Sequence, residues 1–199
     1  MKKQVRLDSI QALLTKPSFT VVEAKNLGVS PAHLAYYIKK GHVKRLSRGI
    51  YQGANYQGTL ESFRWDDLIE AVNSVPNGVI CLISALAVYE ITEEIPRQHW
   101  IAVSHGTTIN RASSVKVVRL RNMELGKIQF DIGGVKIPIF DRERTIIDSF
   151  RLLSRETAIK ALKISLAKKN SERLDLRKLQ SYAKKLRFNI DPYLITATT

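Results

Sequence analysis

Hydrophobic positions between residues 7 and 40 recur at steps of three and four, the period of an amphipathic helix. The first set predicts a helix over about 7–15, and Pro17 ends it. Two shorter helices are predicted over about 21–27 and 31–40, and Thr20 is expected to cap the first of these two. The positions expected to face inward are Leu7, Ile10, Leu13 and Leu14 in the first helix, Val21, Ala24 and Leu27 in the second, and Leu34 and Ile38, with Tyr37 partly behind them, in the third.

The segment between the second and third predicted helices has the residues of a tight turn. Gly28 can adopt the left-handed conformation that ends a helix, Ser30 can cap the next helix, and Pro31 suits its first position. Residues 42–52 then predict a short basic hairpin with its turn at 47–49. Two helices joined by a short turn and followed by a hairpin predict a winged helix-turn-helix that binds DNA.

The polar segment 53–58 is the predicted boundary between a DNA-binding domain, 1–54, and a second domain, 59–199. Gly133 and Gly134 predict a tight hairpin in the second domain. We expect an α+β fold, in which the winged helix-turn-helix precedes a mixed α/β domain with a small, mainly antiparallel sheet and C-terminal helices. The predicted helices of that domain span about 60–73, 82–91, 141–153, 154–168 and 175–187, and the predicted strands span about 99–104, 115–120, 128–132 and 135–139.

The formal net charge of +14 is concentrated at the two ends of the chain. Residues 1–55 contain ten Lys or Arg and two acidic residues, and residues 142–187 contain fourteen and five. A concentrated positive field attracts nucleic acid and supplies salt-dependent phosphate contacts. Aromatic, hydroxyl and basic groups on one helix face also suit base edges and phosphates. The residues expected to contact DNA are Ser30, Ala32, His33, Tyr36, Lys39, Lys40, Lys44, Arg45 and Arg48.

The sequence contains no pattern typical of a catalytic, cofactor or metal site, and the histidines are dispersed. We therefore expect a protein without enzyme activity, cofactor or metal. Cys81 lies in an apolar run, which favours a buried thiol in a reducing compartment over a disulfide or a nucleophile. The longest apolar segment, 79–89, is too short to span a bilayer, and no signal sequence is evident. We expect a cytoplasmic protein with no membrane partner.

Two alternatives for the second domain stay open. Asp131, Asp141 and Glu143, with Lys136, lie on or beside the predicted hairpin, and acids with a lysine on strands can form a metal-dependent nuclease site. A solvated sheet face with Asp141 as a helix cap explains the same residues. The domain can also be a ligand-sensing or protein-docking module attached to a DNA reader.

The chain resembles the AbiEi family of antitoxins, the transcriptional regulators of type IV abortive-infection toxin–antitoxin systems. The first matching segment is the end of the predicted winged helix, Gly-His-Val-Lys-Arg-Leu-Ser-Arg-Gly-Ile-Tyr at 41–51. The second is Ser-Ala-Leu-Ala-Val-Tyr-Glu-Ile-Thr at 84–92. The third, Pro-Ile-Phe-Asp-Arg-Glu-Arg-Thr-Ile-Ile-Asp at 138–148, looks like the family's Asp-x-Glu-Arg-Thr helix start.

This resemblance implies a repressor that binds double-stranded DNA at inverted repeats in its own promoter. It also implies that the C-terminal domain counteracts a nucleotidyltransferase-like toxin during phage defence, in many members without a stable complex. Basic residues of the C-terminal helices are then the candidate antitoxin surface. They are Arg142, Arg144, Arg151, Lys160 and Lys163.

Overall fold

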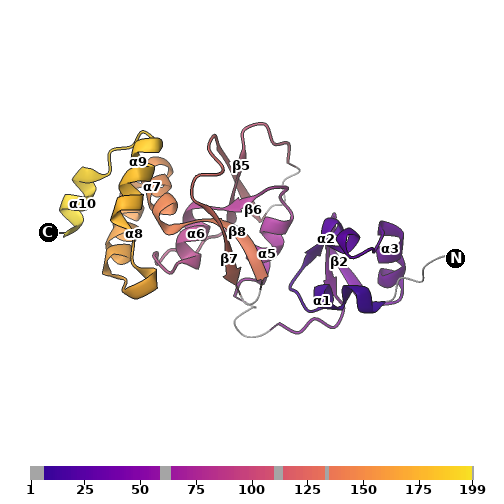
Figure 1. Ribbon diagram of the computed structural model, residues 1–199. Helices are drawn as coiled ribbons and strands as arrows, with labels where there is room; N and C mark the ends of the chain where they lie inside the picture. The colour runs from indigo at the N-terminus through magenta and orange to yellow at the C-terminus, as the bar shows by residue number, and fades with distance from the viewer. Residues whose placement is uncertain (1–6, 59–63, 110–113, 133–134, 199) are drawn as a thin grey trace. The chain divides into compact units, whose positions relative to one another are not determined.

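The computed structural model of the protein describes residues 7–58, 64–109, 114–132 and 135–198 (Figure 1). The chain divides into two compact units. The first contains residues 1–76 and 131–137, and the second contains residues 77–130 and 138–199. This division falls after Pro76 and not within the predicted boundary at 53–58. The predicted boundary of the DNA-binding domain stays a prediction.

The first unit begins with short helices and a small antiparallel sheet. A 3₁₀ turn, η1, precedes three α-helices, and three strands form a sheet in the order β1-β3-β2. The elements are η1 (Leu7–Ile10), α1 (Gln11–Leu14), β1 (Phe19–Thr20), α2 (Val21–Asn26), α3 (Pro31–Lys39), β2 (Val43–Ser47), β3 (Ile50–Gly53) and, further along the chain, α5 (Asp66–Asn73).

The ends of α2 and α3 have the predicted capping residues. The Thr20 hydroxyl accepts a hydrogen bond from the Glu23 amide, and the Glu23 carboxylate accepts one from the Thr20 amide, which completes a capping box. The Ser30 hydroxyl accepts from the His33 amide at the start of α3. Gly28 has a φ of +81°, so the left-handed turn between the helices is confirmed.

The core of this region is formed largely by the predicted residues, with two corrections. Leu27 was expected to face inward, but it follows the end of α2 and is 43% exposed, because the chain turns at Gly28. On α3, Tyr37 is buried and Ile38 is 36% exposed, the reverse of the prediction. The Tyr37 ring packs edge-on against the rings of Tyr36 and His42. The buried cluster comprises Ile10, Leu13, Phe19, Ala24, Val29, Leu34, Tyr37, Val43 and Tyr51.

A second sheet has five strands in the order β6-β5-β4-β8-β7. β4 is antiparallel to β5 and parallel to β8, and β5 is parallel to β6 along six residue pairs. The prediction of a mainly antiparallel sheet is therefore wrong. Strand direction depends on crossover connections, which local patterns do not reveal. The strands are β4 (Val79–Ile80), β5 (His99–Ser104), β6 (Val115–Leu120), β7 (Lys127–Ile132) and β8 (Val135–Phe140). The predicted Gly133–Gly134 turn lies outside the described residues.

The second unit also contains α6 and the C-terminal helices. α7 packs against α6, α8 and α9, and α10 packs against α8 (Figure 1). The helices are α6 (Leu82–Val88), α7 (Arg142–Leu152), α8 (Arg155–Ala167), α9 (Leu176–Lys185) and α10 (Asp191–Thr198), with a 3₁₀ turn, η2 (Asn170–Glu172), before α9. The sequence did not predict α10. Across the described ranges, no helix is long and apolar enough to cross a membrane.

Candidate nucleic-acid interface

The first candidate site is the surface of α3. Ala32, Tyr36, Lys39 and Lys40 are exposed, and they recur at steps of three and four along the helix. His33 is half-buried, and its Nδ1 lies 3.0 Å from the Ser30 hydroxyl. The Ser30 hydroxyl therefore both caps the helix and contacts the His33 ring, which restricts the orientation of that ring.

Tyr36 is the most exposed aromatic residue on this helix, at 54%. The Lys40 ammonium lies 5.8 Å from the centre of the Tyr36 ring, within range of a cation–π contact. The Lys40 charge and an aromatic face are thus presented together in the last turns of α3. A phosphate and a base edge could be contacted from this one pair of residues.

The hairpin of β2 and β3 supplies the remaining predicted cations. Lys44 and Arg45 are exposed on β2, and Arg48 is exposed in the turn that follows. Gly49 completes the turn with a φ of +84°, a conformation that favours glycine. The Arg45 Nε donates a hydrogen bond to the Ser47 carbonyl at 3.2 Å, so this guanidinium is held against its own strand.

β2 contacts α3, so the structure brings the two groups of predicted residues onto neighbouring elements. Each residue in the predicted DNA-binding set is exposed or half-exposed. Leu46, which is not among the predicted DNA-binding residues, is also exposed in this hairpin. Its exposure depends on the pairing of β2 with β3, and the hydrophobic pattern alone does not show that pairing.

The predicted antitoxin surface needs one correction at Arg144. This side chain is only 1% exposed, so it is not part of an outer surface. Its Nε donates to Asp148 at 2.6 Å, and a terminal nitrogen donates to the Leu125 carbonyl at 2.9 Å. Asp148 also accepts from Arg151, whose side chain is partly exposed, at 2.6 Å. Arg144 is buried because its hydrogen bonds to Asp148 and to the Leu125 carbonyl hold α7 against the segment before β7.

Asp141 and Glu143, the acids of the alternative nuclease site, have structural partners. The Lys178 ammonium of α9 lies 3.0 Å from Asp141 and 3.1 Å from Glu143. Asp141 caps α7 as predicted, by accepting from the Arg144 amide. The Tyr182 hydroxyl donates to Asp141 at 3.1 Å, and burial together with the Asp141 charge raises the pKa of that hydroxyl.

These contacts give both carboxylates a role in holding α9 against the start of α7. Glu143 also accepts a hydrogen bond from the Asp175 amide, next to α9. Asp131 and Lys136, the other members of that alternative, are exposed on β7 and β8. In the portion of the chain that the structure describes, no group of three His, Cys, Asp or Glu residues is arranged to hold a metal ion.

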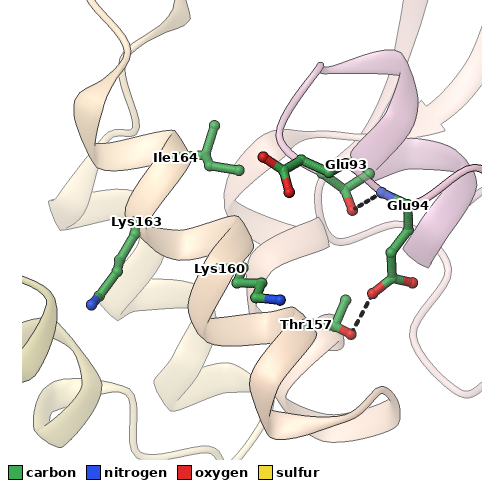
Figure 2. Close-up of a pocket in the computed structure, with 7 residues that line it drawn as sticks. Glu93, Glu94, Thr157, Lys160, Lys163 and Ile164 are labelled. Carbon is green, nitrogen blue, oxygen red and sulfur yellow. Dashed lines mark hydrogen bonds between the residues drawn. The ribbon is translucent and has the colours of Figure 1, made fainter.

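Lys160 and Lys163 line a groove along α8, with a volume of about 380 Å³ (Figure 2). Glu93 and Glu94 line the same groove, and the Thr157 hydroxyl donates to Glu94 at 2.6 Å. Lys160 also pairs with Glu156 at 2.8 Å on its own helix. Lys160 therefore has acidic neighbours on its own helix and across the groove, and the sequence did not reveal the neighbours across the groove.

Cys81 is buried, as predicted, and is 1% exposed. Burial raises the pKa of its thiol well above the ordinary value, with a smaller contribution from the charge of Asp148. A thiol with a raised pKa is a poor nucleophile because it carries little thiolate. The interpretation of Cys81 as a buried core residue is confirmed.

Comparison with known proteins gives a match for the N-terminal region. No curated protein matches the chain. Residues 12–52 match the family described as "Transcriptional regulator, AbiEi antitoxin". The matched residues run from α1 to β3, and so include α2, α3 and the hairpin. The family that the sequence resembles is therefore the one whose model matches this part of the chain.

Proposed function

We propose that the protein is a DNA-binding repressor that acts as the antitoxin of a type IV toxin–antitoxin system. The observation that carries this proposal is the family match at residues 12–52, which coincides with the exposed basic residues of α3 and the hairpin. In this proposal residues 1–54 form a winged helix-turn-helix, with α3 as the recognition helix and β2–β3 as the wing. Residues 59–199 form the antitoxin domain.

The exposed side chains support two kinds of DNA contact. Lys39, Lys40 and Lys44, with Arg45 and Arg48, bind phosphates and supply the salt-dependent part of the affinity. The start and exposed side of α3 read base edges in the major groove, which is wide enough for a helix. The residues assigned to base contacts are Ser30, Ala32, His33 and Tyr36.

The target is double-stranded DNA in the protein's own promoter, at inverted repeats. The protein acts in the cytoplasm, and its second domain counteracts a nucleotidyltransferase-like toxin, with or without a stable complex. Arg142, Arg151, Lys160 and Lys163 remain candidates for that action, since each is exposed or half-exposed. Neither role requires a cofactor or an enzymatic step from this chain.

Two substitutions separate the two kinds of DNA contact. Lys44→Ala should weaken binding to every DNA sequence and reduce the slope of log K against log salt by about one. His33→Ala should instead change the preference at a base pair by about 1–3 kcal/mol. Fluorescence anisotropy with promoter and random duplexes at several salt concentrations measures both effects. Lys127→Ala, an exposed lysine on β7, is the control. Equal losses for His33→Ala and Lys44→Ala on all sequences would contradict the assignment of α3 as the recognition helix.

The antitoxin role is tested by co-expression with the adjacent toxin gene. The wild-type chain should restore growth to cells that express the toxin. A Lys160→Ala/Lys163→Ala variant should restore growth less well and keep its promoter affinity, because these residues lie on α8 and outside the family match. Full rescue by this variant would show that Lys160 and Lys163 are not part of the antitoxin surface. No rescue by the wild-type chain would contradict the antitoxin role itself.

A further inference from the structure

Leu46 occupies an irregular position in the hairpin. Arg45 pairs with Tyr51 of β3, and the next pair joins Ser47 to Ile50, so Leu46 is an extra residue without a cross-strand partner. Such a bulge bends a strand and redirects side chains. Leu46 is 37% exposed, and β2 lies at the edge of its sheet.

An isolated exposed leucine is ordinary on a protein surface. At Leu46, however, three features coincide: an apolar side chain, a bulge, and exposed cations on both sides. Lys44 and Arg45 precede Leu46, and Arg48 follows it. The hydrogen bond from Arg45 to the Ser47 carbonyl spans the bulge and fixes the backbone on either side of Leu46.

We propose that Leu46 is an apolar contact of the wing with the DNA minor groove. This inference rests on the proposed function, in which α3 occupies the major groove. Major and minor grooves alternate along the duplex, and β2 lies against α3. The hairpin then meets the phosphates that border the adjacent minor groove. Lys44, Arg45 and Arg48 bind those phosphates, and the leucine between them contacts the sugars and base edges of the groove.

An apolar contact of this kind contributes to specificity. Leucine side chains that enter the minor groove partly unstack a base step, and the energetic cost depends on how easily that step deforms. A contact made by Leu46 would therefore favour flexible steps in the promoter over stiff ones. Because Leu46 carries no charge, removing it should leave the salt dependence of binding unchanged.

Leu46→Ala in the full chain tests this contact. We expect promoter binding about tenfold weaker, the effect of removing a few methylene groups from an apolar contact. The slope of log K against log salt should not change, whereas Lys44→Ala should reduce it by about one. Leu46→Met, which keeps an apolar side chain, should retain the wild-type affinity. Leu27→Ala is the matched control, because Leu27 is also an exposed leucine of the first unit and lies outside the hairpin.

Hydroxyl-radical footprinting locates the contact, since these radicals attack sugars from the minor groove. Leu46→Ala should lose protection at one segment beside the α3 site and keep the remainder. If Leu46→Ala keeps the wild-type affinity and footprint while the wild-type protein prefers the promoter, the assignment of Leu46 is overturned. The proposed function is not affected by that result. A wild-type protein with no preference for the promoter would overturn the proposed function, and the inference about Leu46 with it.

Discussion

At the scale of single residues, Asp141, Glu143 and Arg144 of the Asp-x-Glu-Arg-Thr segment are buried, and each is paired with another residue of the fold. Asp141 caps α7 and binds Lys178 and Tyr182, while Glu143 binds Lys178. Arg144 pairs with Asp148. The sequence predicted the cap at Asp141 because capping is local. It did not predict Lys178 as the common partner, because the contact joins segments far apart in the chain.

Arg144→Met should destabilise the fold by about 3 kcal/mol, because it leaves Asp148 buried with only the partly exposed Arg151 as a partner. Urea unfolding followed by circular dichroism measures the change. Lys127→Ala, which breaks an exposed ion pair with Glu124, is the control and should change stability by less than about 0.5 kcal/mol. A loss below about 1 kcal/mol for Arg144→Met would show that the buried pair contributes little.

At the scale of helices and strands, the sequence was most informative where the chemistry is local. The turn at Gly28, the caps at Thr20 and Ser30, and the hairpin with its turn at Gly49 all follow from short-range rules. The parallel pairing of β5 with β6 and of β4 with β8 does not, since it depends on the path of the chain between strands. The bulge at Leu46 depends likewise on the register of β2 against β3.

Ser30→Ala should lower the free energy of unfolding by about 1 kcal/mol, the usual cost of a lost N-cap. It should also weaken promoter binding, because α3 and the His33 ring lose a common anchor. Ser30→Asn retains a capping group without adding charge, so it should keep most of the stability. Thermal unfolding and anisotropy measure the two effects. Unchanged stability in Ser30→Ala would contradict the role of this cap.

At the scale of the whole molecule, charge separates the regions of the chain. The segments 1–55 and 142–187 carry the positive excess, and the residues between them are close to neutral. In the first segment the cations are exposed on α3 and the hairpin. In the second, several cations have carboxylate partners, such as Lys178 with Asp141 and Lys160 with Glu156. Net charge alone therefore overstates how much of the C-terminal surface attracts an anionic partner.

The proposed function requires that this chain recognises its own promoter. The most direct measurement is an anisotropy titration of the full chain on DNA from immediately upstream of its gene, with random DNA of equal length, at several salt concentrations. We predict salt-sensitive binding that is at least about a hundredfold tighter on the upstream DNA. Equal and weak binding to both fragments would contradict promoter recognition by this chain.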